Sequence, residues 1–180
     1  MVKESSREPL VGPDPMFDPL KSVPAPVQVV MCLDTPWYEL MWTGRKTHEF
    51  RRRFLTGTRV EWFVYLTAPE SRLCAVIDLD PAIEGTPHEL AQIAERMSPG
   101  SGATVEPYLA KGDRTHGYAM PIRRVREFQG FPAADLEQMV YGFHPPQGYV
   151  LVNGNSVWRT VCDRLLSTPL LRDSLIEPAS

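Results

Sequence analysis

The chain has 180 residues, of which 43% are hydrophobic and 23% charged, a composition typical of one globular domain with its own core. It contains no apolar run of about 18 residues and no apolar signal segment at its start, so we expect a cytoplasmic protein without a membrane span. Its net charge of −3 argues against a protein that coats long nucleic acids, because such proteins are usually basic.

Three cysteines, Cys32, Cys74 and Cys162, lie far apart in the chain, without a C-x-x-C pair or a histidine at zinc spacing. We therefore predict reduced, buried thiols and no metal site. The motifs of P-loop NTPases, Rossmann dehydrogenases, α/β-hydrolases and common zinc proteases are also missing, and no cofactor is implied.

The first 26 residues contain six prolines, a density that prevents a helix and removes backbone donors. We expect residues 1–26 to form an extended arm. Beyond it, the valine-rich run 27–33 predicts a buried strand. A helix should follow from Thr35, with Pro36 in its first turn and Gly44 at its end.

In this first helix the spacing of Trp37, Leu40 and Met41 predicts an apolar stripe that faces the core. Downstream we predict strands at 58–67, 73–79, 117–128 and 148–152, and helices at 86–97, 104–110, 133–140 and 155–166. Residues 168–180 should form a tail with at most one helical turn. Strands outnumber those of a doubly wound sheet, so this order predicts an α+β fold with a mixed barrel and flanking helices.

The most unusual stretch is residues 44–53, GRKTHEFRRR. Its five basic side chains and one glutamate give a net charge of +4, so the remainder of the chain carries −7. Arginine forks bind phosphate groups and base edges through charge-assisted hydrogen bonds. The ligand-binding residues that we predict in and beside this stretch are Trp42, Arg45, Lys46, Thr47, Arg51, Arg52 and Arg53.

If the stretch is a strand, its side chains alternate, with Lys46 and Phe50 on one face and Glu49 and Arg51 on the other. Glu49, among several basic groups, should stay ionised and paired, which would orient the site. The alternative is a solvated, charged edge strand, since charges at a sheet edge block aggregation.

Asp78 and Asp80 lie two residues apart at the end of the strand predicted at 73–79, so both carboxylates should share one face. Two close carboxylates can divide the acid and base roles of a reaction, which makes Asp78 a candidate catalytic residue. The alternative is a strand end that turns into solvent.

The segment 143–149 holds two consecutive prolines before a strand, and these fix an extended backbone. Gln147 could there present an amide donor and acceptor to a base edge, so we include it among the predicted ligand-binding residues. The alternative is a rigid connector without a binding role.

The chain also shows an ordered series of motifs: an apolar strand, a short helix that ends in TGRKT, then EFRRR, AVIDL, YAMPIRRV and PPQGY. This series resembles the ASCH domain of the PUA-like superfamily. The resemblance covers roughly residues 27–152 and leaves the arm, 1–26, and a C-terminal helix and tail, 153–180, outside. It implies a PUA-like β-barrel with a cleft under residues 44–53 that recognises RNA or a nucleoside.

Some members of that family look like ribonucleases, and others are amidohydrolases that use a lysine, a threonine three residues later and a later glutamate. Lys46 matches the lysine, Glu49 stands where the threonine would be, and Asp78 is the nearest candidate for the glutamate. The resemblance thus implies these three as catalytic residues. A carboxylate cannot replace a hydroxyl nucleophile in amide hydrolysis, which weakens the amidohydrolase assignment.

Three functions follow as hypotheses. The first is a binding module for RNA or a nucleotide-like ligand. The second is an enzyme acting on a nucleoside or RNA, amidohydrolase-like or ribonuclease-like, with Lys46 as base or electrostatic stabiliser. The third is an accessory subunit whose protein partner contacts the arm or the C-terminal helix.

Overall fold

The computed structural model describes residues 24–177, and most of the predicted arm lies outside this range. The described residues form eight strands and five helices. In chain order these are β1 (Val27–Leu33), α1 (Thr35–Trp42), β2 (His48–Arg51), β3 (Val60–Leu66), β4 (Arg72–Leu79), β5 (Ile83–Gly85), α2 (Pro87–Met97), α3 (Gly102–Ala110), β6 (Gly117–Pro132), α4 (Ala133–Met139), β7 (Tyr149–Leu151), α5 (Ser156–Leu166) and β8 (Leu170–Leu175).

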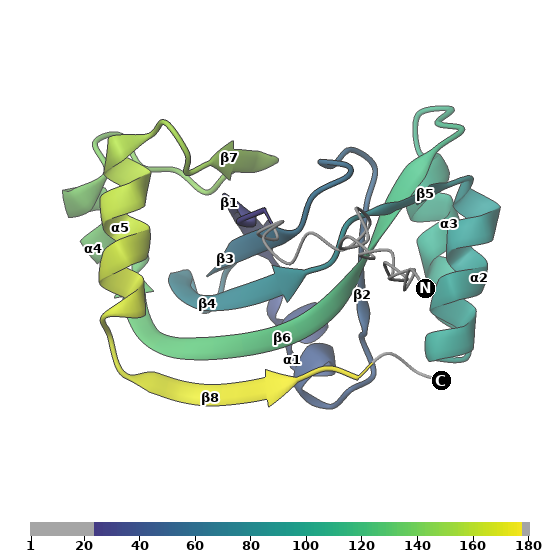
Figure 1. Ribbon diagram of the computed structural model, residues 1–180, viewed down its shortest axis with the longest axis horizontal. Helices are drawn as coiled ribbons and strands as arrows, with labels where there is room; N and C mark the ends of the chain where they lie inside the picture. Colours follow the sequence, from purple (N-terminus) through teal and green to yellow (C-terminus); the bar gives the residue numbers. More distant parts are fainter. Residues whose placement is uncertain (1–23, 178–180) are drawn as a thin grey trace, which may run out of the picture.

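The strands form one curled mixed sheet in which β2, β6, β4, β3, β1 and β7 follow one another. β1 and β3 pair in parallel, whereas β3 with β4 and β4 with β6 pair antiparallel. The 16-residue strand β6 also pairs with β5 and β8, and it runs across the molecule from the α2–α3 pair to the α4–α5 pair (Figure 1). The predicted α+β class, with a mixed barrel and flanking helices, is confirmed in the form of a half-barrel.

Hydrophobic side chains cover both faces of this sheet. On one side, Trp62 and Ile77 pack with Met41 of α1, and we call this side the α1 face. On the other side, Phe63 of β3 packs with Trp158 of α5, and we call this side the α5 face. Consecutive residues of a strand point to opposite faces of the sheet. Because hydrophobic side chains cover both faces, nearly all residues of β3 and β4 are buried.

Two predicted helix starts are confirmed by their caps. Thr86 begins α2 with a complete capping box, in which its side chain accepts a hydrogen bond from the Glu89 backbone amide and the Glu89 carboxylate accepts one in return. Asn155 begins α5 by accepting a hydrogen bond from the Trp158 backbone amide. None of the helices within residues 24–177 is long and apolar enough to cross a membrane.

Two expectations about the elements are wrong. In α1 it is Tyr38 and Met41 that are buried, whereas Trp37 is 45% exposed, so the helix is rotated relative to the predicted stripe. The tail predicted after residue 168 instead forms the strand β8, which pairs with β6. Neither outcome can be predicted from the spacing of residues along the chain. The rotation of α1 depends on how this helix docks on the sheet, and β8 forms because an edge of β6 is free for pairing.

Candidate functional site

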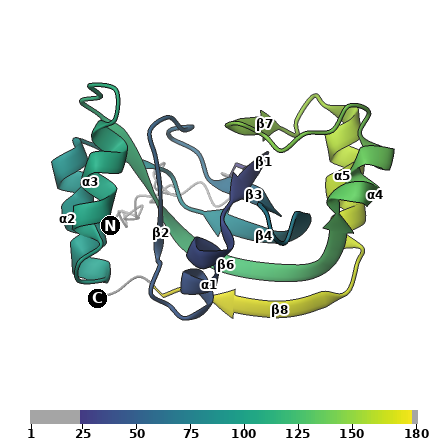
Figure 2. The same cartoon turned by 180° about the vertical axis from the view of Figure 1, so that it is seen from behind.

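A cavity of about 370 Å³ opens beside β2, and we call it the β2 cleft. Viewed from behind, β2 lies between the α2–α3 pair and β1 (Figure 2). The cleft is lined by Cys32, Leu33, Asp34, Trp37, Lys46, Glu49, Phe50, Arg51, Thr104, Val105 and Tyr108. The basic stretch that stands out in the sequence therefore lines a cavity together with α1 and α3.

The position of Glu49 in the cleft follows from the pairing of β2 with β6. Their register sets Glu49 opposite Met120, a fully buried residue, and Glu49 itself is only 4% exposed. A carboxylate buried to this extent must be paired, since an isolated buried charge is too costly.

Two basic side chains make these pairs. Lys46 Nζ lies 3.1 Å from Glu49 Oε2, and Arg51 Nε lies 2.8 Å from Glu49 Oε1. Both contacts are ion pairs by distance, but they are not aligned as hydrogen bonds. Glu49 Oε2 and Arg51 Nε are themselves buried, so the accessible parts of this cluster are the remaining N–H groups of Lys46 and Arg51.

The protonation state of Glu49 follows from these neighbours. Burial alone would raise the pKa of the carboxyl group, but the positive charges of Lys46 and Arg51 outweigh burial and hold this pKa below its ordinary value. Glu49 is thus ionised at neutral pH, and its predicted pairing with basic groups is confirmed.

Lys46 and Arg51 also contact aromatic rings, in addition to their ion pairs with Glu49. The Arg51 guanidinium stacks over Trp62, 5.4 Å from the ring centroid, and its Nη2 donates a 3.0 Å hydrogen bond to the Cys32 carbonyl. Lys46 Nζ lies 5.7 Å from the centroid of Trp37 and 5.8 Å from that of Phe50. The charged floor of the cleft is therefore preorganised before any ligand enters.

Two aromatic side chains extend from the helices that flank the cleft. Trp37 of α1 is 45% exposed and Tyr108 of α3 is 38% exposed, although large aromatic side chains are mostly buried in folded proteins. The Arg52 guanidinium lies over Tyr108, 5.3 Å from the ring centroid. Exposed rings beside fixed charges can stack on a planar group.

A smaller cavity of about 110 Å³ shares Trp37 and Lys46 with the cleft and is also lined by Arg45 and Thr47. The Thr47 hydroxyl is buried and lies 3.0 Å from Nδ1 of His48. Burial, and then the charge of Lys46, lower the pKa of His48 below its ordinary value. Arg45 and Thr47 thus lie beside the β2 cleft rather than in it.

Four predicted ligand-binding residues line neither cavity, and one of them is Arg52, which lies over Tyr108 beside the β2 cleft. The Trp42 ring is covered by the Arg172 guanidinium of β8, 4.3 Å from its centroid. Arg53 and Gln147 are exposed on the surface. Gln147 follows Pro146, whose carbonyl accepts a hydrogen bond from the Cys32 thiol, so its loop passes near the cleft.

Asp78 is separated from Lys46 and Glu49 by the sheet. It pairs in register with Glu61, and Glu61 precedes Trp62, so Asp78 points to the α5 face whereas Arg51 stacks on Trp62 at the α1 face. Asp78 is instead paired with Arg126 at 2.8 Å. The structure does not bring together the three residues that the resemblance implies as catalytic.

Sequence reasoning missed several residues that line the cleft. The sequence predicts Trp37 in the core, and no motif points to Asp34, Thr104 or Tyr108. No local pattern marks them, because they come from α3 and from the start of α1, which meet β2 only after folding. Only Trp37 could have been found from the sequence. Its position in α1 is also compatible with the side of the helix that remains exposed.

No family model matches the chain, and no curated protein sequence matches it. Three crystal structures of an ASCH protein from Zymomonas mobilis have a similar fold. The ASCH protein itself matches with a TM-score of 0.62 at 18% identity, over 81% of this chain and 96% of that chain. Its serine-to-alanine variant matches with a TM-score of 0.63 at 19% identity, over 79% and 96%. Its tyrosine-to-phenylalanine variant matches with a TM-score of 0.62 at 20% identity, over 78% and 96%.

These structures cover most of the described residues, so the likeness concerns the whole fold rather than a single motif. At this level of identity it concerns the fold alone. The curled mixed sheet and its flanking helices agree with the resemblance seen in the motifs at residues 27–152. The chain therefore has an α+β fold like that of the Zymomonas mobilis ASCH protein.

Proposed function

We propose that the β2 cleft binds a nucleoside or nucleotide-like group, either free or as part of an RNA. The observation that carries this proposal is the buried carboxylate of Glu49, held between Lys46 and Arg51 below the exposed rings of Trp37 and Tyr108. The arrangement offers planar contact surfaces and fixed hydrogen-bonding groups within one cavity.

Each part of the site suits one part of such a ligand. Stacking of a base on an aromatic side chain stabilises a complex by roughly 1–3 kcal/mol. Lys46 and Arg51, which are partly exposed and held in place by the buried Glu49, can donate hydrogen bonds to the oxygen atoms of a base. Arg52, over Tyr108 at the side of the cleft, can donate to a phosphate group.

The charge balance favours a small ligand over a long strand. Within the cleft, Lys46 and Arg51 are balanced by Asp34 and Glu49, so the lining has no net positive charge. A surface that binds long nucleic acids depends on excess positive charge and counterion release. We therefore expect a modest salt dependence that reflects contacts with few phosphates.

Binding is better supported than amide hydrolysis. Hydrolysis through a covalent intermediate needs an activated nucleophile in the cleft. Burial raises the pKa of the Cys32 thiol to about 11, which leaves it protonated at neutral pH. The Thr47 hydroxyl is buried in the neighbouring cavity beside His48. The ion pair of Lys46 and Glu49 still resembles an acid–base pair. The binding experiment should therefore also measure whether the ligand is converted to a product.

The proposal can be tested by thermal shift against a panel of nucleosides, nucleotides and short RNAs at low and high salt. A ligand at about 100 times its Kd adds roughly 2.7 kcal/mol of stability. We expect at least one such shift in the wild-type protein and its loss in Lys46→Ala. Each variant is compared with its own ligand-free melting temperature, because removing Lys46 also leaves Glu49 less well paired.

The matched control is Arg159→Ala, which removes an exposed cation on α5, outside the residues that line the cleft. Retention of the shift in this control and loss in Lys46→Ala would place the ligand in the cleft. Incubation of the same ligand with the protein, followed by product analysis, then separates binding from catalysis. An equal shift in both variants would contradict the assignment of the site.

A further inference from the structure

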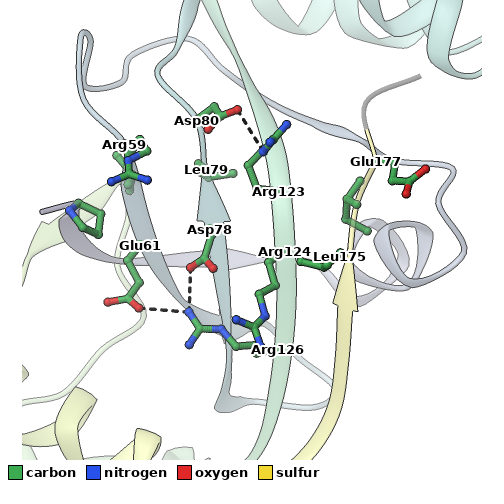
Figure 3. Close-up of a pocket in the computed structure, with 13 residues that line it drawn as sticks. Arg59, Glu61, Asp78, Leu79, Asp80, Arg123, Arg124, Arg126, Leu175 and Glu177 are labelled. Carbon is green, nitrogen blue, oxygen red and sulfur yellow. Dashed lines mark hydrogen bonds and ion pairs between the residues drawn. The ribbon is translucent and has the colours of Figure 1, made fainter. Parts of the chain in front are cut away.

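A second and larger cavity, of about 650 Å³, opens over β3, β4, β6 and β8, and we call it the arginine cavity (Figure 3). It shares no lining residue with the β2 cleft. Four arginines and four carboxylates surround it, together with five apolar residues. The charged residues are Arg59, Arg123, Arg124, Arg126, Glu61, Asp78, Asp80 and Glu177.

A bulge in β6 brings two consecutive arginines to this cavity. In the register with β4, Asp78 lies opposite Arg124 and Leu79 opposite Ile122, so Arg123 is an extra residue without a partner. Consecutive strand residues normally point to opposite faces, but a bulge redirects the side chain at the extra position. Arg123 and Arg124 therefore both line the cavity.

The arginines at one end of the cavity are already engaged. Arg126 Nη2 lies 2.8 Å from Asp78 Oδ1 and 3.2 Å from Glu61 Oε1. Arg124 binds Asp173 through two hydrogen bonds of 2.8 and 2.6 Å. These pairs link β3, β4, β6 and β8, so we assign a structural role to both arginines.

The arginines at the other end are not saturated. Figure 3 shows Arg59 and Arg123 at the end of the cavity near Asp80, away from Arg126. Arg59 donates one hydrogen bond, of 3.3 Å, to the Pro24 carbonyl, and Arg123 contacts Asp80 only through Nε at 3.4 Å. Since a guanidinium has five donors, most of their N–H groups have no partner among residues 24–177.

The spacing of the strands allows both guanidinium groups to reach one anion. Arg59 directly precedes β3 and Arg123 is in β6, with β4 between these strands. Adjacent strands lie about 4.8 Å apart, so these two backbones are roughly 10 Å apart. Figure 3 shows the two guanidinium groups on either side of Asp80, and because both side chains are exposed, each can rotate to cover half of this span. Asp80 contacts Arg123 from the Nε side, which leaves both terminal nitrogens of that guanidinium for a ligand.

We propose that the arginine cavity is a second binding site, which takes the phosphate group of a small organic phosphate between Arg59 and Arg123. Guanidinium groups match the geometry of phosphate oxygens in paired hydrogen bonds. Leu175, which is 75% exposed, offers apolar surface to the organic part of the ligand. Four carboxylates balance the four arginines, so the cavity lacks the excess positive charge on which binding of a long nucleic acid depends, and this favours a small phosphate.

The test is a titration of the ¹⁵N-labelled full chain with ribose 5-phosphate, inorganic phosphate and, as an anion without phosphate, acetate. We expect saturable shifts of the backbone amides around Arg59, Leu79 and Arg123 with both phosphates, and weaker, unsaturated shifts with acetate. In the double variant Arg59→Gln and Arg123→Gln, we expect at least a tenfold weaker affinity for ribose 5-phosphate. Arg159→Gln is the charge-matched control and should bind like the wild-type protein.

Several outcomes would overturn this second site. One is unchanged phosphate binding in the double variant, provided that its spectrum shows the native fold. Another is a set of shifts confined to Trp37, Arg52 and Tyr108, which would place the phosphate in the β2 cleft. Binding to the β2 cleft does not depend on Arg59 or Arg123, so the two sites succeed or fail separately.

Discussion

At the scale of single residues, Glu49 determines both the charge balance of the β2 cleft and part of the protein's stability. Replacing it by glutamine keeps the size of the side chain but leaves Lys46 and Arg51 near each other without a carboxylate. Breaking a buried ion pair in this way typically costs about 3–5 kcal/mol. We expect a loss of about 3 kcal/mol in urea unfolding for Glu49→Gln, whereas the exposed control Glu137→Gln should change little.

The same residue predicts a pH dependence. The folded-state pKa of Glu49 lies below its ordinary value of 4.5, so the unfolded chain takes up this proton first as the pH falls. The stabilisation by Glu49 is complete above pH 4.5 and is lost as the pH falls from there through the folded-state pKa. The difference in unfolding free energy between wild type and Glu49→Gln should therefore shrink below pH 4.5. A constant difference across this range would show that folding does not lower the pKa of Glu49.

The residues of the site could be predicted from sequence only in part. The charge pattern of residues 44–53 predicts a paired Glu49, because this pairing follows from neighbours along one strand. It also predicts a basic cleft, and this is wrong, because Asp34 and Glu49 balance Lys46 and Arg51 in the lining. Trp37 and Tyr108 could not be predicted as lining residues, since helices from different parts of the chain place them there. The sequence predicts that Trp42 contacts a ligand, whereas in the structure the guanidinium of Arg172, 130 residues later in the chain, covers the Trp42 ring.

At the scale of elements, the long strand β6 depends on one glycine. Gly130 has a φ of +64°, and a Cβ atom there would lie 2.1 Å from the Leu73 carbonyl oxygen of β4. We predict that Gly130→Ala destabilises the protein by about 3 kcal/mol or more, because both the backbone conformation and the strand contact must change. Gly148→Ala is the control, since a Cβ atom there meets open space, and it should stay within about 0.5 kcal/mol of wild type. Chemical unfolding measures both, and equal stability of the two variants would contradict this role of Gly130.

Most elements could be predicted where local signals decide their ends. The capping box at Thr86 and the asparagine cap at Asn155 mark the starts of α2 and α5 in the sequence, and the structure confirms both. The strand β8 could not be predicted in this way. Its residues, LLRDSL, are mostly exposed and have no clear alternation, and they become a strand because the edge of β6 is available for pairing.

At the scale of the whole molecule, the curled sheet separates two charged regions. The β2 cleft lies with α1 at one side of β3 and β4, and the carboxylates of Glu61 and Asp78 point to the other side. The fold class could be predicted from the order of elements, because strands outnumber a regular β–α alternation. The sequence could not predict which acidic residues share a site. A shift of the β4 register by a single residue would turn Asp78 to the opposite face of the sheet.

The most direct test of the binding proposal is a tryptophan fluorescence titration with the nucleotide that gives the largest thermal shift. Trp62 and Trp158 are buried, whereas Trp37 is exposed at the β2 cleft, so a stacked base should quench mainly Trp37. We predict saturable quenching in the wild-type protein and its loss, together with at least a fivefold weaker affinity, in Trp37→Phe. Undiminished quenching and unchanged affinity in a natively folded Trp37→Phe protein would contradict a base-binding β2 cleft.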